Sequence, residues 1–148
     1  GGGAAHAHRL LKPDNAGYFR RHALPQFVSA VTAACMVVHK SSFLAVGGFD
    51  AEDLPVSFND VDLCLKLNAR GWQSLYEPRA QLVHHESVSR GFDRDPVGAK
   101  RQAGELAALR SRWSVHEPSP DDDWRSCQAD PFHHPALSPF REQFGRRL

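Results

Sequence analysis

Residues 47–87 contain a carboxylate and two histidines that could act together in catalysis. Asp60 lies near the start of a helix-like stretch, and His84 and His85 follow it about one strand further along the chain. A carboxylate can act as a general base, and an imidazole can bind a metal ion. Brought together in one cleft, these groups would equip a catalytic site.

Asp60 stands out because of its place on the helix expected at residues 59–70. At 3.6 residues per turn, it falls near Cys64 and Leu67, among apolar residues and opposite a polar stripe. An ionised carboxylate that points away from water costs free energy unless it is paired or hydrogen-bonded. Asp60 is therefore either a satisfied helix-start acid or a functional residue. The polar stripe consists of Asn59, Asp62, Lys66 and Arg70.

The structural alternative is that acidic side chains cap this helix. A carboxylate in the first turn is stabilised by the free N–H groups and by the helix dipole. Two pairs resemble a capping box, Ser57 with Asp60 and Asn59 with Asp62. Asp62 is better explained as structural, because it can pair with Lys66 four residues later on the solvent-facing stripe. For Asp60, capping and catalysis both stay open.

The two histidines follow a short β-prone region. Residues 72–76 favour a strand, residues 77–78 a turn, and residues 80–83 a second, apolar strand. Neighbouring side chains in a strand point to opposite faces, so His84 and His85 are not expected to bind one metal ion together. From residue types alone, a hydrogen-bonded structural histidine is commoner at such a place than a metal ligand.

Three segments in this order carry a resemblance. The combination of GGFD (47–50), NDVDLCL (59–65) and HHxxxS (84–89) resembles the C-terminal half of a family 2 glycosyltransferase of the GT-A fold. The likeness is greatest to bacterial enzymes that build O-antigen and related surface polysaccharides. Flanking stretches such as DNAGYFRR and DPFHHPALSPFREQF extend it over nearly the whole chain.

The resemblance implies a role for each matching residue. The second member of the ED-like pair is the general base in such enzymes, and Asp60 holds that position after Asn59, where Glu is usual. The first histidine of the pair commonly completes the metal site, which points to His84, with His85 as the alternative. The remaining residues expected to line the site are Gly48, Asp50 and Asp62 near the acceptor cleft, and Ser87 and Arg90 near the sugar diphosphate.

The implied reaction moves a sugar, with inversion, from a nucleotide-diphosphate sugar to a glycan or lipid-linked acceptor. Such a displacement needs a base aligned with the acceptor hydroxyl and positive charge beside the departing diphosphate. In the complete enzyme, a divalent cation, Mn²⁺ or Mg²⁺, would supply that charge.

The donor-binding half of the GT-A fold is expected to lie elsewhere. No hydrophobic strand with a Gly-rich or acidic loop precedes residue 27, and the acidic run 121–123 comes after the histidines. We therefore interpret the chain as part of a longer enzyme, inactive alone. Two other classes stay open: a glycan-binding module without chemistry, and a small metal-dependent hydrolase that uses His84, His85 and Asp60.

Composition excludes several further classes. The chain has 148 residues, 41% hydrophobic and 24% charged, with a net charge of +1, so nucleic acid is not an expected partner. Its three cysteines are widely spaced and suggest neither disulfides nor a zinc site. No signal peptide or membrane-length apolar run is present, so we expect a cytoplasmic protein, with peripheral association at the inner face of the bacterial membrane as the alternative.

These residues are expected to sit on one α/β domain with a mixed sheet and flanking helices. Its parts are a loop region at 1–26, a core at 27–113 and an irregular tail at 114–148. Within the core we expect a long central strand at 27–39, a helix at 41–46 capped by Ser41 or Ser42, the helix 59–70 ended by Gly71, and a helix at 97–113 with Leu106, Leu109 and Trp113 on one face. An exposed sheet edge favours a homodimer.

Overall fold

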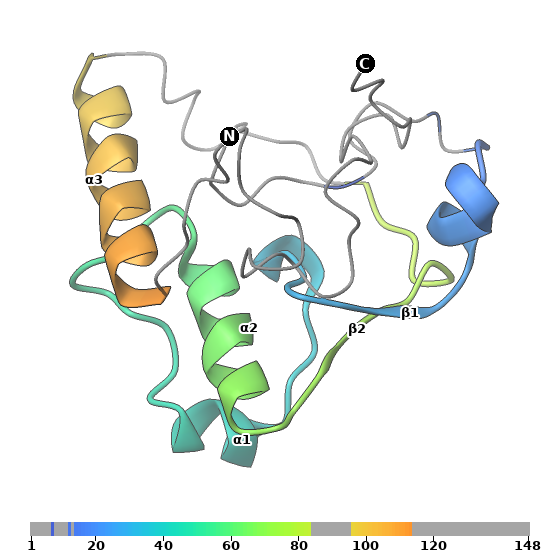
Figure 1. The fold of residues 1–148 in the computed structure, drawn as a ribbon, viewed down its shortest axis with the longest axis horizontal. Helices are drawn as coiled ribbons and strands as arrows, with labels where there is room; N and C mark the ends of the chain where they lie inside the picture. Colours follow the sequence, from blue (N-terminus) through green and yellow to red (C-terminus); the bar gives the residue numbers. More distant parts are fainter. Residues whose placement is uncertain (1–6, 8–11, 13, 84–95, 114–148) are drawn as a thin grey trace, which may run out of the picture.

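The computed structural model describes residues 7, 12, 14–83 and 96–113 (Figure 1). Helices and a small sheet both form along these residues, which is consistent with the expected α/β class, but the described sheet is one antiparallel pair and not the expected mixed sheet. The elements in order are the 3₁₀ turn η1 (Tyr18–Ala23), β1 (Gln26–Val28), the 3₁₀ turn η2 (Ala33–Cys35), α1 (Lys40–Ala45), α2 (Asn59–Ala69), β2 (Ser74–Tyr76) and α3 (Pro96–Trp113).

The sheet is smaller than the sequence suggests. β1 pairs antiparallel with β2, with Phe27 opposite Leu75, and over the described residues this pair is the whole sheet. The long strand expected at 27–39 is wrong, because a strand needs a partner for its backbone and β2 offers three residues. The chain then turns into η2, where the Thr32 hydroxyl accepts the Ala34 N–H. Residues 80–83 also form no strand.

α2 begins and ends close to the expected positions. Its N-cap is Phe58, which has a left-handed backbone (φ 62°) and no side-chain capping bond, so neither expected capping pair forms. At the other end, Gly71 (φ 82°) allows two reverse bonds, from Gly71 N–H to the Asn68 carbonyl at 2.9 Å and from Trp72 N–H to the Leu67 carbonyl at 3.1 Å. This is the glycine-terminated helix end that the sequence predicts.

α1 explains the double glycine of the GGFD turn. The helix has His39 as its N-cap without a side-chain bond, so the expected serine cap is wrong. It ends with the same pair of reverse bonds, from Gly47 N–H to the Leu44 carbonyl and from Gly48 N–H to the Phe43 carbonyl. Both glycines have positive φ, and a Cβ on Gly48 would lie 2.8 Å from the Phe43 ring. The turn therefore has no room for a side chain at Gly48.

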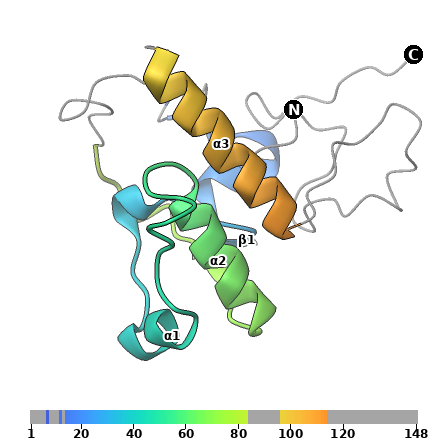
Figure 2. The same cartoon turned by 90° about the vertical axis from the view of Figure 1, so that its left-hand side faces the viewer.

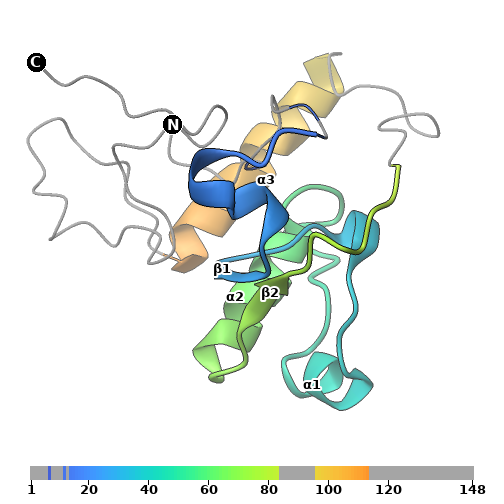
Figure 3. The same ribbon diagram turned by 90° about the vertical axis from the view of Figure 1, so that its right-hand side faces the viewer.

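The buried core gathers around α2. α3 runs beside α2 (Figure 2), and β1 and β2 lie along another side of α2 (Figure 3). On the sheet side, the Asn68 amide donates to the Ser29 carbonyl at 2.8 Å and the Val31 N–H donates to the Cys64 sulfur at 3.5 Å. The buried apolar side chains are Leu54, Leu63, Cys64, Leu67 and Leu109.

α3 is the expected second amphipathic helix, with one surprise on its buried face. Leu109 is buried as expected, but Glu105 is also buried, with 3% of its area exposed.

No helix within the described part of the chain is long and apolar enough to cross a membrane. The homodimer through a sheet edge stays a prediction.

Candidate functional site

The first turn of α2 presents Asp60 to its surroundings as a half-buried, oriented carboxylate. Its Oδ2 accepts the backbone N–H of Ala33, the first residue of η2, at 3.0 Å. Its Oδ1 accepts the N–H of Val61 at 2.9 Å. Asp60 therefore ties α2 to η2, and two backbone donors fix the direction of its carboxylate.

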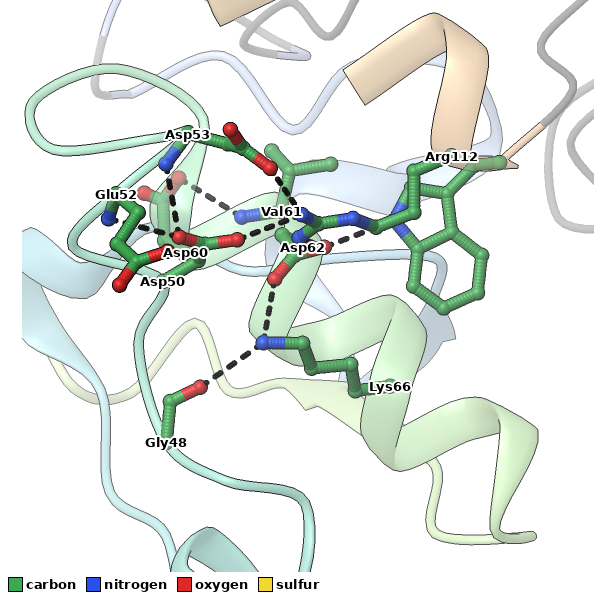
Figure 4. A network of polar contacts seen from close by, with 10 residues as sticks. Gly48, Asp50, Glu52, Asp53, Asp60, Val61, Asp62, Lys66 and Arg112 are labelled. Carbon is green, nitrogen blue, oxygen red and sulfur yellow. Dashed lines mark hydrogen bonds and ion pairs between the residues drawn. The ribbon is translucent and has the colours of Figure 1, made fainter. Parts of the chain in front are cut away.

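Asp62 has the environment that the sequence suggested for Asp60. It is completely buried, whereas Asp60 is half-buried, so the solvent-facing assignment of Asp62 was wrong. The reason is α3, whose last turn places Arg112 and Trp113 against Asp62 (Figure 4). The expected pair between Asp62 and Lys66 does form, with Nζ 2.7 Å from Oδ2.

Both oxygens of the Asp62 carboxylate face polar or charged neighbours, Oδ2 through the ion pair with Lys66. Its Oδ1 accepts the indole N–H of Trp113 at 2.9 Å and a guanidinium N–H of Arg112 at 3.1 Å. Burial alone would raise the pKa of Asp62, but the contacts with Lys66, Trp113 and Arg112 outweigh burial and hold that pKa below its ordinary value. Asp62 is therefore an ionised, compensated structural acid.

The GGFD turn is joined to the same network. Lys66 donates to the Gly48 carbonyl at 3.2 Å, and Arg112 lies 2.6 Å from Oδ2 of Asp50 (Figure 4). The other oxygen of Asp50 accepts the N–H groups of Glu52 and Asp53, each at 2.9 Å. The N–H of Asp53 and the Arg112 guanidinium are the main causes that lower the pKa of Asp50 to about 2. Asp50 therefore acts as the closing residue of its own turn.

The structure brings most of the expected site residues to one corner. Asn59, half-buried, begins α2 beside Asp60. The GGFD turn is tied to α2 by Lys66, which bonds the Gly48 carbonyl, and by Arg112, which joins Asp50 to Asp62. The other expected residues lie outside the described residues; they are His84, His85, Ser87 and Arg90.

A metal site does not form from the described residues. Among residues 7, 12, 14–83 and 96–113, no group of three or more His, Cys, Asp or Glu is arranged to hold a metal ion. The buried carboxylate of Asp62 already faces two cations, Lys66 and Arg112. These residues therefore do not fit a divalent cation, and His84 remains the expected ligand.

Sequence reasoning missed the contribution of α3. Arg112 contacts Asp50, Asp53 and Asp62, and Glu105 accepts the Ser57 N–H at 2.5 Å. A signal was present, because Glu105 and Arg112 are seven residues apart and share a helix face with Leu109. Charged residues on an apolar face need partners, which is the argument first applied to Asp60.

Comparison with known proteins finds bacterial relatives. The chain is 42% identical over 144 residues to the uncharacterised protein y4gI of Sinorhizobium fredii, across 97% of this chain and 15% of that protein. It is 32% identical over 109 residues to the O-antigen biosynthesis protein RfbC of Myxococcus xanthus, across 74% of this chain and 7% of that protein.

A third relative is named for a transfer reaction. The chain is 42% identical over 70 residues to the N-acetylglucosaminyl-diphospho-decaprenol L-rhamnosyltransferase of Mycobacterium tuberculosis, across 47% of this chain and 22% of that protein. The chain thus spans less than a quarter of the length of each of these relatives. No protein-family model matches the chain, and no solved structure matches it significantly. Part of the chain is therefore similar to a glycosyltransferase.

Proposed function

We propose that this chain is the acceptor-side part of an inverting family 2 glycosyltransferase of the GT-A fold, with Asp60 as its general base. The donor would be a nucleotide-diphosphate sugar and the acceptor a glycan or lipid-linked sugar of a bacterial surface polysaccharide. The reaction would take place in the cytoplasm or at the inner face of the membrane. The names of two relatives, an O-antigen biosynthesis protein and a rhamnosyltransferase, support this class.

The observation that carries the proposal is the contrast between Asp60 and its acidic neighbours. Asp50 and Asp62 both lie in ion pairs with Arg112, whereas Asp60 is half-buried and is held by two backbone N–H groups. An ionised carboxylate can accept about four hydrogen bonds, so Asp60 keeps acceptor capacity for an incoming hydroxyl. Of these three aspartates, it is the one best suited to take a proton.

The proposed chemistry is one displacement. The acceptor hydroxyl oxygen attacks the anomeric carbon of the donor, and its proton passes to the carboxylate of Asp60. The bond from the anomeric carbon to the diphosphate oxygen breaks, and the nucleoside diphosphate leaves with the electron pair. Attack opposite the leaving group inverts the configuration at the anomeric carbon.

A divalent cation remains part of the proposal, with His84 as its ligand and His85 as the alternative. Such a cation would neutralise charge on a diphosphate. The described residues supply no site for it, and the role of Asp60 does not depend on it.

The test is a transfer assay on the natural protein that contains this sequence. Nucleotide-diphosphate sugars are offered with a lipid-linked or glycan acceptor, the product is detected by mass spectrometry, and its anomeric configuration is assigned by NMR. We expect a product one sugar larger than the acceptor, of inverted configuration. Acceptor binding without transfer would instead indicate a glycan-binding module, and cleavage of the glycan without a donor would indicate a hydrolase.

A further inference from the structure

A single guanidinium near the end of α3 contacts three carboxylates. Nη2 of Arg112 lies 2.6 Å from Oδ2 of Asp50 and 2.9 Å from Oδ2 of Asp53, and Nη1 lies 3.1 Å from Oδ1 of Asp62. The Arg112 side chain is 31% exposed, whereas that of Asp62 is fully buried. Arg112 thus reaches from the surface into the corner that holds Asp60 (Figure 4).

The three carboxylates belong to two different parts of the chain. Asp50 and Asp53 lie in one turn, closed by the bonds from the N–H groups of Glu52 and Asp53 to Oδ1 of Asp50. Asp62 lies on α2, two residues after Asp60. The turn is thus already closed by its own hydrogen bonds. Arg112 fastens this turn to the end of α2 that carries the proposed base.

α3 holds the same loop at a second point. Oε2 of Glu105 accepts the N–H of Ser57 at 2.5 Å, just before α2 begins. Glu105 and Arg112 are seven residues apart and so lie on one face of α3, about two turns from each other. This face of α3 therefore holds the segment that leads into α2 at two points, Asp53 and Ser57.

We propose that Arg112 is a positioning residue, which holds the turn of Asp50 and Asp53 at a fixed place relative to Asp60. This inference rests on the proposed function, in which the turn forms part of the acceptor cleft. A planar guanidinium can present separate N–H groups to several carboxylates at once, whereas a lysine ammonium is a single point charge. The geometry therefore requires arginine, and charge alone does not satisfy it.

The test compares Arg112→Lys, which keeps the charge, with Lys100→Gln, which removes a charge from an exposed position on the same helix. Amide hydrogen exchange in the natural protein that contains this sequence reports on the turn. We expect Arg112→Lys to speed exchange at Glu52 and Asp53 about tenfold or more, with α2 beyond its first turn unchanged. Lys100→Gln should leave all of these amides unchanged.

Kinetics separates positioning from a general loss of stability. We expect Arg112→Lys to raise KM for the acceptor about tenfold or more while KM for the donor stays unchanged. A lower kcat with both KM values unchanged would mean a smaller folded fraction and would overturn the inference. Unchanged exchange at the turn, or faster exchange throughout the protein, would overturn it as well.

A second variant guards against loss of folding. Asp53 is 61% exposed at its side chain, so Asp53→Asn removes one arm of the contact without disturbing the core. It should give a smaller acceleration of exchange in the same turn, and no change there would contradict the inference. If the unaltered protein transfers no sugar, the proposed function fails, and hydrogen exchange alone decides whether Arg112 holds the turn.

Discussion

Replacing the buried acid Asp62 by Asn should destabilise the fold far more than the same change at Asp60. Breaking a buried ion pair by removing one partner typically costs about 3–5 kcal/mol. The two cations that face Asp62, Lys66 and Arg112, keep 22% and 31% of their side chains exposed, so water can partly solvate them. The amide oxygen can also still accept the N–H of Trp113. We therefore expect Asp62→Asn to lower the free energy of unfolding by about 2–3 kcal/mol.

The matched control is Asp60→Asn. Asp60 is half-buried and bonds two backbone N–H groups, of which an amide oxygen can still accept one. Asp60→Asn should therefore lower the free energy of unfolding by about 1 kcal/mol or less. Urea unfolding followed by circular dichroism gives both free energies, and the Asp62 variant should melt about 5–10 °C lower than the parent. Equal losses at the two positions, or a larger loss at Asp60, would refute the assignment of Asp62 as the structural acid.

Two further results are expected. In the same urea experiment, Gly48→Ala should lower the free energy of unfolding by about 2–4 kcal/mol, because it adds a clash with the Phe43 ring to the strain of a positive φ. Gly47→Ala has open space around its Cβ and should lower it by about 1–2 kcal/mol. Similar losses for the two variants would contradict this packing. Asp50 and Asp62 both have lowered pKa values when folded, so their stabilisation is present above the usual value near 3.8 and is lost as pH falls. The melting temperature should therefore drop as the pH falls from about 4 to about 2, which is the folded pKa of Asp50. Arg112→Gln should make that drop smaller.

Local signals in the sequence predicted the helices well. The period of the apolar residues and the glycine at position 71 placed α2, and apolar spacing placed α3. The prediction of a strand at 27–39 was wrong because the length of a strand depends on its partner. The apolar run alone does not show that β2 offers only three residues for pairing. The double glycine at 47–48 ends α1, and the nearby Phe43 ring explains why position 48 has no side chain.

The candidate site shows what local reasoning misses. The spacing of Asp62 and Lys66 predicted their ion pair, but the side of α2 that faces solvent is decided by α3. Arg112 lies 50 residues beyond Asp62 in the sequence, and no local period links them. On α3, the buried Glu105 and the partly exposed Arg112 share a face with the buried Leu109, and this placement signals that they have partners without naming them.

The sugar-transfer rate of Asp60→Asn, in the natural protein that contains this sequence, tests directly whether Asp60 is the general base. The substitution keeps the size of the side chain and one of its two backbone hydrogen bonds but removes the base. We expect a loss of about 10²–10⁴-fold in the rate, with the melting temperature and donor affinity close to those of the parent. A rate within about threefold of the parent would be a much smaller loss than removal of a general base causes. It would contradict the assignment of Asp60 as the base.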